Sequence, residues 1–368
     1  MNKQSWNPKY TINSTIAKAL MEIEAAKAVV EQTSLSVMVE SELRHKARVR
    51  STHYSTRIEG NKLTLKETQE IVEKTKTNFH GRERDVNEVK NYWDALVKAE
   101  EWAANKIELT EEIIKKLHAM VVKGKRSKPT SYRTEQNAVR DSVSGGLIYL
   151  PPEAKDVPQL MSAMVKWVQH GQRKQMPVPI IAALAHYQFV TIHPYYDGNG
   201  RTARLLATLI LQRDGYGLNG LFSMEEHHAK DIESYYNSLE VHQHQHHNYY
   251  DGRANSDLTS WIEYFVVLLA KVFTQAKEEA LKYSKEGIVA VPSEIRKLDH
   301  RARIVLSLFA KKDIIFSQDI AAVLGLSGRM VRILLNKWVK DGFLVIENPS
   351  NKSRSYKLSE KYQQFIGK

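Results

Sequence analysis

Apolar residues recur three and four positions apart along much of this chain, a spacing that is typical of amphipathic helices. The pattern predicts helices over residues 10 to about 100, 110–122, 156–170 and 257–286. The expected fold class is therefore mainly α. The apolar stripes that support these helices are Ile16, Leu20, Ile23 and Val30, then Val89, Tyr92, Trp93 and Leu96, and finally Trp261, Tyr264, Phe265 and Leu268.

Two more apolar segments flank a short polar stretch in the middle of the chain. Residues 180–192 predict an amphipathic helix, and Pro194 disfavours helical geometry at His193, so the chain is expected to turn there. A second helix is expected after Gly200. The apolar positions of these two helices are Ile181, Leu184, Ala185 and Phe189 in the first, and Leu205, Leu206, Leu209 and Ile210 in the second.

The polar stretch, residues 193–204, has the sequence His-Pro-Tyr-Tyr-Asp-Gly-Asn-Gly-Arg-Thr-Ala-Arg. Gly198 and Gly200 allow the backbone to bend tightly and to approach a ligand closely. The turn that they form precedes a helix, whose free N–H groups and dipole favour an anion. Arg201 and Arg204 are expected on one face of that helix, where they suit phosphate oxygens. The stretch therefore predicts a phosphate site.

Two further residues of this stretch suit chemistry on a phosphate. Asp197 offers a hard oxygen ligand, which favours Mg²⁺ over zinc. His193 has a side chain that can take a proton from a hydroxyl near neutral pH. The combination of base, carboxylate, glycines and arginines indicates a nucleotide-phosphate site that also carries a catalytic base.

These residues resemble the motif of the Fic family, His-x-Phe-x-Asp/Glu-Gly-Asn-Gly-Arg-x-x-Arg, and depart from it only at Tyr195, where Phe is usual. The resemblance extends from about residue 10 to 285, most of the chain. It implies AMPylation, in which AMP moves from ATP to a Ser, Thr or Tyr hydroxyl of a target protein, or of the enzyme itself, and pyrophosphate leaves. The Tyr195 ring is expected to pack into the core, where its hydroxyl would need a partner.

The resemblance implies a role for each residue of the motif. His193 would deprotonate the target hydroxyl, Asp197 would hold Mg²⁺ against the α- and β-phosphates of ATP, and Arg204 would bind the γ-phosphate. A related branch that transfers phosphate has Lys at the second glycine, so Gly200 favours nucleotide transfer. The implied nucleotide-binding residues are Gly198, Asn199, Gly200, Arg201, Thr202, Ala203 and Arg204, with Tyr236 near the adenine.

An upstream segment, residues 55–60, fits the inhibitory pattern of the same family, Ser/Thr-x-x-x-Glu-Gly/Asn, with Ser55 and Glu59 at its key positions. In the family that glutamate pairs with the second arginine of the motif, here Arg204. The resemblance therefore implies autoinhibition, because the pair would deny Arg204 to the γ-phosphate. Two alternatives remain open: a surface glutamate near a helix end, or a glutamate that helps to remove AMP from targets.

Two short runs of strand-forming residues surround the turn residues Ser144, Gly145 and Gly146. They resemble the flap of the Fic family, a hairpin that can pair with an extended target segment and present its hydroxyl to His193. The alternative is a plain surface hairpin. The expected target-binding residues are Asn137, Ala138, Val139 and Arg140 on one strand, and Leu147, Ile148 and Tyr149 on the other.

The pattern changes after about residue 290. The predicted elements are helices over residues 303–310, 317–324 and 328–340 and a strand pair over residues 343–347 and 355–358. Ser317 is expected to cap the second helix. This order resembles a winged helix-turn-helix, which can bind DNA, dock a target or form a dimer. The basic residues that could contact a phosphate backbone are Arg329, Arg332, Lys337 and Lys340 on the third helix, with Lys352 and Arg354 in the wing.

Composition narrows the class of protein further. The chain of 368 residues has no cysteine, which excludes disulfides and thiolate zinc sites. It has no run of about eighteen apolar residues and no apolar signal core at its start, so a cytoplasmic protein without a membrane partner is expected. The net charge is +12, and residues 299–368 hold 13 Lys and Arg against 6 Asp and Glu, a net +7. Positive charge is thus concentrated at one end, which bears on partners such as DNA.

Histidines outside the motif offer two more candidates. The tract 242–247 contains four histidines, which suit Zn, Cu or Ni, yet no carboxylate or cysteine pattern surrounds it, and a polar loop is expected. His186 lies on the helix before the motif, where a hydrogen-bonded core position is expected rather than a second base.

The sequence as a whole predicts three segments: an N-terminal helical segment with the inhibitory motif (1–105), a Fic catalytic core with following helices (106–286) and the winged helix-turn-helix (290–368). The leading hypothesis is an autoinhibited, Mg²⁺-dependent protein adenylyltransferase that uses ATP and, by family analogy, is a homodimer. The rival is a DNA-binding winged-helix regulator whose Fic domain senses nucleotide. Transfer of UMP or phosphocholine in place of AMP also stays open.

Overall fold

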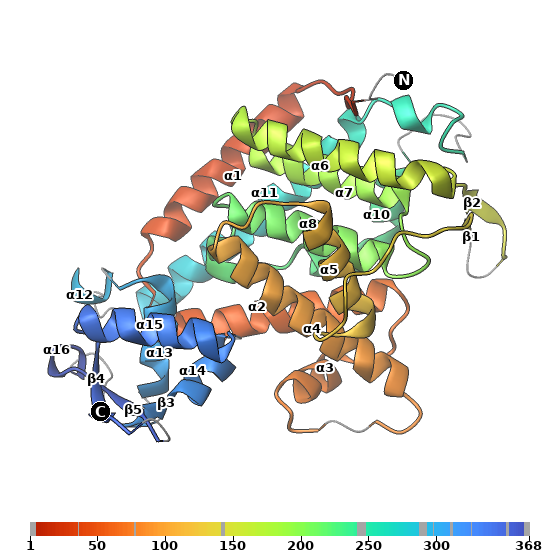
Figure 1. Ribbon diagram of the computed structural model, residues 1–368. Helices are drawn as coiled ribbons and strands as arrows, with labels where there is room; N and C mark the ends of the chain where they lie inside the picture. Colours follow the sequence, from red (N-terminus) through yellow and green to blue (C-terminus); the bar gives the residue numbers. More distant parts are fainter. Residues whose placement is uncertain are drawn as a thin grey trace. The chain divides into compact units, whose positions relative to one another are not determined.

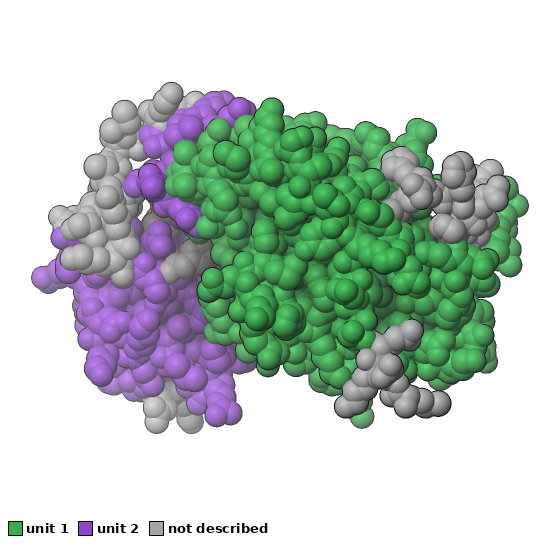
Figure 2. All heavy atoms as spheres, turned by 90° about the horizontal axis from the view of Figure 1, so that it is seen from above, with its two compact units in different colours: residues 1–29, 46–277 green, residues 30–45, 278–368 purple. Residues whose placement is uncertain are grey.

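The computed structural model describes residues 5–35, 37–76, 79–140, 144–240, 248–286, 293–296, 298–309, 312–324, 326–350 and 353–363. These residues are mostly helical and include two small antiparallel sheets, which confirms the predicted mainly α class (Figure 1). The chain divides into two compact units, residues 1–29 with 46–277 and residues 30–45 with 278–368 (Figure 2). No helix among the described residues is both long and apolar enough to span a membrane.

The first unit consists of helices and one hairpin. Its helices confirm those predicted over residues 110–122, 156–170 and 257–286 to within three residues. The helices are α1 (Ser14–Gln32), α2 (Val37–Ile58), α3 (Leu65–Val72), α4 (Glu83–Ala104), α5 (Glu111–Lys123), α6 (Val157–Arg173), α7 (Val178–Ile192), α8 (Asn199–Arg213), α9 (Met224–Lys230), α10 (Ile232–Leu239) and α11 (Thr259–Glu286). By residue number, α1, α2 and α11 extend into the second unit.

Side-chain caps define where several of these helices begin. The Thr64 hydroxyl accepts the Glu67 N–H at 3.2 Å, and the Glu67 carboxylate accepts the Thr64 N–H at 2.7 Å, a reciprocal pair that starts α3. The Thr110 hydroxyl starts α5 by accepting the Ile113 N–H at 3.2 Å. These caps satisfy N–H groups that have no partner within the helix.

α7 is buried on every side. Each side chain from Pro179 to Phe189 is buried, so the prediction of a single apolar face is wrong. The reason is that α6 and α8 pack against α7, and the Trp261 indole of α11 donates to the Ala183 carbonyl at 2.7 Å. A helix that is apolar on all sides belongs in a core. The C-terminal end of this helix delivers His193 to the surface of that core.

A two-stranded hairpin, β1 (Val139–Arg140) and β2 (Leu147–Tyr149), projects from the helices of the first unit (Figure 1). Val139 pairs with Tyr149 and Arg140 with Leu147, with a register shift between the two pairs. The first strand is two residues shorter than predicted, and the Asn137 side-chain amide before it donates to the Tyr195 carbonyl. The hairpin is nevertheless present at the predicted place.

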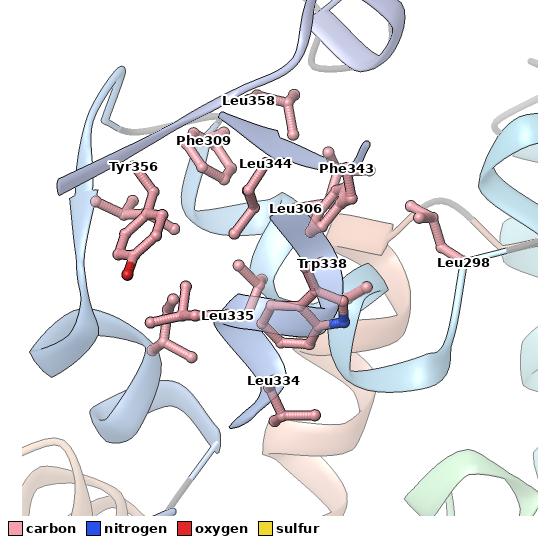
Figure 3. Close-up of a cluster of buried hydrophobic side chains, with 14 of the residues drawn as sticks. Leu298, Leu306, Phe309, Leu334, Leu335, Trp338, Phe343, Leu344, Tyr356 and Leu358 are labelled. Atoms are coloured by element: carbon pink, nitrogen blue, oxygen red, sulfur yellow. The ribbon is translucent and has the colours of Figure 1, made fainter. Parts of the chain in front are cut away.

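The second unit contains a three-stranded antiparallel sheet of order β3-β5-β4 packed against helices. Its elements are α12 (Ser293–Arg296), α13 (His300–Phe309), β3 (Ile315–Phe316), α14 (Ser317–Leu324), α15 (Gly328–Lys340), β4 (Leu344–Asn348), β5 (Ser355–Leu358) and α16 (Glu360–Gln363). Apolar side chains of α13, α15, β4 and β5 point toward one another in its core (Figure 3). The three predicted helices and the strand pair are confirmed to within three residues, whereas β3 was not predicted.

The start of α14 differs from the prediction. Ser317 is the first residue of this helix, so its expected role as the cap is wrong. The Asp319 carboxylate accepts the Phe316 N–H at 2.8 Å and satisfies that donor instead. A serine cap is found one helix later, where the Ser327 hydroxyl accepts the Met330 N–H at 3.4 Å.

Replacement of Trp338 by alanine tests whether this core stabilises the second unit. Trp338 is 1 % exposed and donates to the Asp299 carboxylate at 2.9 Å. Its removal is expected to lower the free energy of unfolding by about 3–5 kcal/mol. Urea unfolding of the full chain, followed by circular dichroism, should show an earlier loss of helix. Ile333→Ala is the control, because Ile333 lies on the same helix and is 56 % exposed. Equal midpoints of urea unfolding for the two variants would contradict the claim that Trp338 stabilises this core.

Candidate active site

The loop between α7 and α8 gathers the motif residues. α7 ends at His193, whose backbone is left-handed with a φ of 50°, and α8 begins after Gly198, which has a φ of 77°. The Asn199 side chain closes the loop, because its N–H donates to the Tyr195 carbonyl at 2.8 Å and its oxygen accepts the Tyr195 N–H at 3.1 Å. The predicted turn at His193 is confirmed, and the second helix starts two residues earlier than expected.

The two glycines of the loop are required for different reasons. At Gly198 a Cβ atom would lie 2.5 Å from Cγ1 of Val122, and the positive φ disfavours other residues. At Gly200 a Cβ atom would lie 2.3 Å from Oε1 of Glu59. Gly198 therefore shapes the backbone, whereas Gly200 leaves room for an oxygen-bearing group above the start of α8.

His193 has the tautomer that a base requires. Its Nδ1 lies 3.2 Å from the Val190 carbonyl oxygen, which can only accept, so Nδ1 carries the proton and Nε2 keeps its lone pair. Burial lowers the pKa of His193 below the usual histidine value, which keeps the ring neutral at pH 7. The side chain can therefore accept a proton at Nε2.

Asp197 is the exposed carboxylate of the loop. Its side chain is 70 % exposed and accepts the Gly198 N–H at 2.6 Å and Nη2 of Arg201 at 3.2 Å. Arg201 itself is buried, and its Nη1 lies 3.7 Å from Oε1 of Glu88 on α4. Arg201 thus lies between two carboxylates, one of which faces solvent and can hold a cation.

Arg204 is a buried cation whose partners lie in the last turn of α2 and just after it. Its Nε donates to the Ser55 hydroxyl at 3.1 Å, and its Nη2 donates to the Ser55 carbonyl and to Oε1 of Glu59, both at 2.8 Å. Burial alone would lower the pKa of Arg204, but the Glu59 carboxylate raises it above its usual value, so the guanidinium stays charged. The structure therefore brings Ser55 and Glu59 together with Arg204, which is far from both of them in the sequence.

His118 supports the loop from α5, and the sequence pattern did not single it out. Its Nε2 donates to the Asp197 carbonyl at 2.8 Å, and its ring stacks on Tyr195 with centroids 3.5 Å apart. Burial lowers the pKa of His118 to about 4, so the ring is neutral at pH 7. A histidine on the buried face of an apolar helix was the signal that could have found it.

The Tyr195 ring packs into the core as expected, but its hydroxyl does not find the partner that was expected. Among the described residues, the buried hydroxyl oxygen forms no hydrogen bond. The stacked His118 ring lies parallel to the tyrosine ring, so packing along its face, and not a polar contact at its edge, stabilises Tyr195.

The paired tyrosines of α10 have different environments. The Tyr235 hydroxyl is buried and lies 3.2 Å from Nε2 of His186, whereas the Tyr236 side chain is exposed. His186 is buried, so this contact confirms that it is a hydrogen-bonded core residue, and burial lowers its pKa to about 3. Tyr236 is therefore the tyrosine of the pair that a ligand can reach. The remaining expected nucleotide-binding residues, Thr202 and Ala203, are buried within α8.

The hairpin is attached to the core next to the loop. The Tyr149 hydroxyl donates to the Thr191 carbonyl at 2.9 Å, near the end of α7. Leu147 and Ile148 are exposed apolar residues on β2. Of the other expected target-binding residues, Ala138 and Arg140 are also exposed. The hairpin thus presents an exposed face close to the motif.

Metal-ligating side chains do not cluster in the part of the chain that the structure describes. No group of three or more His, Cys, Asp or Glu residues that could hold a metal occurs there. The histidine tract 242–247 lies outside the described residues. Asp197 is the candidate for a cation that takes its other ligands from a substrate.

The basic residues of the second unit lie on the outer side of α15. Arg329, Arg332, Lys337 and Lys340 are all exposed, while the opposite side of the helix is buried. Lys337 lies 3.4 Å from the Asp299 carboxylate, so its charge is partly compensated. In the expected wing, Arg354 is exposed and Lys352 lies outside the described residues.

The segment that carries the motif matches a known family. Residues 108–211 match the model of the Fic/DOC family. Over 165 residues the chain is 35 % identical to protein adenylyltransferase Fic of Drosophila erecta, a match that covers 45 % of this chain and 32 % of that protein. The protein of the same name from Drosophila melanogaster is 34 % identical over 165 residues, with the same coverage. The chain spans about a third of the length of these curated relatives.

The chain is also similar to solved structures. The crystal structure of a Fic family protein from Desulfovibrio desulfuricans G20 has a TM-score of 0.60 at 25 % identity, covering 97 % of this chain and 100 % of that chain. A Fic domain containing signaling protein from Bacteroides thetaiotaomicron VPI-5482 also has a TM-score of 0.60 at 25 % identity, covering 76 % of this chain and 100 % of that chain. The protein therefore has the fold of Fic-domain proteins.

The two glycines of the loop provide a matched pair of variants. Gly198→Ala is expected to lower the free energy of unfolding by about 1–3 kcal/mol, because the new methyl group meets Val122 and the positive φ is strained. Gly200→Ala should have a smaller effect, since its φ is not positive and its Cβ meets the ends of two long side chains, Glu59 at 2.3 Å and Arg204 at 3.2 Å. Thermal unfolding of both variants beside wild type measures the difference. A larger drop in Tm for Gly200→Ala would show that the loop is not built as described.

Proposed function

We propose that this chain is a protein adenylyltransferase, which transfers AMP from ATP to a Ser, Thr or Tyr hydroxyl of a target protein and of itself. The observation that carries the proposal is a neutral His193 with a free Nε2 lone pair, six residues before the N-terminus of α8. The match of residues 108–211 to the Fic/DOC family and the names of the curated relatives support it. A cytoplasmic homodimer is the assembly that we infer by analogy with the family.

The transfer needs a base, a phosphate cradle and neutralisation of charge. His193 takes the proton of the target hydroxyl as the hydroxyl oxygen attacks the α-phosphorus. The bond from the α-phosphorus to the oxygen that bridges to the β-phosphate breaks, and pyrophosphate leaves. The free N–H groups at the start of α8 hold phosphate oxygens, and Arg201 adds a fixed positive charge.

Mg²⁺ fits the single exposed carboxylate of the loop. Asp197 is held in place by the Gly198 N–H and by Arg201, which leaves its exposed side available to a cation. Mg²⁺ often binds one or two protein carboxylates and completes its shell with phosphate and water oxygens. When bound, the ion would neutralise charge on the α- and β-phosphates, and Asp197 is the residue that would hold it.

The proposal includes autoinhibition by Glu59. An ATP γ-phosphate would have to displace the Glu59 carboxylate in order to bind Arg204, because the two side chains are already paired at 2.8 Å. Ser55 holds the same guanidinium in place through its hydroxyl and its carbonyl. ATP would then bind in a pose that does not react. Removal of AMP from targets by the same glutamate is a second activity that the family pattern allows.

We assign target binding to the hairpin. An extended target segment would add as a strand to its edge, with main-chain hydrogen bonds for affinity and the exposed Leu147 and Ile148 side chains for apolar contact. The attachment of Tyr149 to the Thr191 carbonyl keeps that segment near His193.

Glu59→Gly is expected to raise self-AMPylation well above that of wild type, because Arg204 becomes free for the γ-phosphate. The measurement is incorporation of label from ATP labelled at the α-phosphate, with Mg²⁺ and purified protein. Glu59→Gly/His193→Ala should lose the label, since the base is gone.

Glu59→Gln is the matched control that separates the effect of the Glu59 charge from the effect of its volume. The amide keeps the size of the carboxylate but not its charge, so label incorporation should fall between wild type and Glu59→Gly. If Glu59→Gly incorporates no more label than wild type while ATP binds, the inhibitory role is wrong. If none of the variants incorporates label although ATP binds, another donor such as UTP is indicated.

A second candidate function is DNA binding by the second unit. The observation that favours it is the exposed basic side of α15, in a helix–strand–helix–helix–strand–strand order that supports the winged-helix prediction. Helices with an exposed basic side bind phosphate backbones in many DNA-binding proteins. The Fic domain would then serve the regulator as a nucleotide sensor.

Arg329→Ala/Arg332→Ala is expected to abolish a salt-sensitive shift of duplex DNA if this second function exists. Both side chains are exposed, so the double variant should keep the stability of wild type. Electrophoretic mobility at two salt concentrations measures the effect, and added salt should weaken wild-type binding steeply. A shift that survives the double substitution would exclude α15 as the DNA-binding helix.

A further inference from the structure

Arg133 is a buried arginine that has no acidic partner in the described part of the chain. It is 3 % exposed, and its guanidinium donates to main-chain carbonyl oxygens instead of carboxylates. Burial lowers its pKa below the usual arginine value. A buried charge is normally paired with an opposite charge, because removal of its hydration costs several kcal/mol. An arginine kept in such a place requires a reason beyond stability.

The carbonyl partners of Arg133 belong to the loop and to both stems of the hairpin. Nε donates to the His193 carbonyl at 3.0 Å. Nη1 donates to the Glu135 carbonyl at 3.0 Å, on the stem that enters the hairpin, and Nη2 donates to the Pro152 carbonyl, on the stem that leaves it. The backbone N–H of Arg133 also donates to the Pro194 carbonyl at 2.9 Å. The guanidinium thus joins its own stem to the other stem, 19 residues away, and to the loop, 60 residues away.

Two other side chains also join the entering stem to the loop. The Asn137 amide donates to the Tyr195 carbonyl at 3.0 Å. The Tyr196 hydroxyl accepts the N–H groups of Thr134 and Glu135 at 3.2 and 3.0 Å. Tyr196 occupies a variable position of the motif and is 60 % exposed, so neither core packing nor the proposed nucleotide contacts explain its place. The stem that enters the hairpin is therefore held to the loop between α7 and α8 by side chains of the stem and by a side chain of the loop.

The attachment reaches the backbone of His193 itself. Its backbone is left-handed, which is strained for a residue with a side chain, and its carbonyl is the one to which Arg133 donates. The hydrogen bond fixes the peptide that follows His193 and thereby the direction of the imidazole. The same guanidinium fixes both ends of the hairpin.

We propose that Arg133 is a positioning residue that sets the target-binding hairpin in a fixed place relative to the His193 imidazole. The proposal rests on the proposed function, since it concerns where a target hydroxyl meets the base. A hydroxyl presented by the hairpin reaches Nε2 of His193 only if the hairpin stems and the His193 peptide keep their relative positions. Tyr196 and Asn137 assist Arg133 in this role.

The test uses the full chain in the Glu59→Gly background, with Arg133→Met, Arg133→Lys and Tyr196→Phe. Loss of positioning by Arg133→Met is expected to lower the rate of AMP incorporation at saturating ATP by about 100-fold. The KM for ATP should stay within about twofold, because the nucleotide contacts are not touched. Arg133→Lys should recover part of the rate, since its ammonium group can still donate to a carbonyl. Tyr196→Phe should lower the rate in the same direction.

Arg173→Met is the matched control, because Arg173 also donates to a main-chain carbonyl but is exposed on α6. A rate for Arg133→Met equal to that of the control overturns the proposal. A rise in the KM for ATP in proportion to the loss of rate also overturns it, because that result places the defect in nucleotide binding. If Arg133→Met does not fold, the exposed Tyr196→Phe variant decides by the same criteria.

Hydrogen exchange separates failure of this proposal from failure of the proposed function. If Glu59→Gly itself incorporates no AMP, the proposed function fails. Hydrogen exchange in the Arg133 variants still tests whether Arg133 holds the hairpin in place. Faster exchange over residues 134–140 and 144–150, with α7 and α8 unchanged, supports it. Unchanged exchange over the hairpin overturns it.

Discussion

The buried Arg204 cation is the constraint on which the active-site arrangement depends. A guanidinium inside a protein core is tolerated only when charged or strongly polar groups surround it. Ser55, in the last turn of α2, and Glu59, just after that helix, provide those groups. These contacts join the C-terminal end of α2 to α8, which carries Arg204. The same interaction occupies the arginine that the proposed reaction needs, so the burial of this charge and the proposed inhibition rest on one contact.

The loop between α7 and α8 is held mainly by hydrogen bonds to its backbone. The left-handed backbone of His193 is strained, and strain of this kind persists only where surrounding contacts fix the conformation. Asn199 closes the loop from within, while His118 and Arg133 bind its carbonyl groups from outside. The Asp197 carboxylate and Nε2 of His193 are consequently left to face a ligand, which is the arrangement that a preorganised site requires.

The sequence predicted what is encoded locally. Helix positions, the turn at His193 and the hairpin follow from spacing, Pro and Gly, and these agree with the structure. The full burial of α7 could not be predicted, because it depends on Trp261 and other residues distant in the chain. His118 was missed for the same reason, since its importance lies in a contact with a loop about 80 residues away. The pairing of Glu59 with Arg204 was expected from the family pattern and not from spacing, and the structure contains that contact.

A crystal structure of the wild-type chain with Mg²⁺ and a non-hydrolysable ATP analogue would test the central claim most directly. The claim is that Glu59 withholds Arg204 from the γ-phosphate. The account predicts that the Glu59 carboxylate stays within hydrogen-bond distance of Arg204 and that the γ-phosphate lies elsewhere. A γ-phosphate bound by Arg204 while Glu59 remains paired with it would contradict the claim.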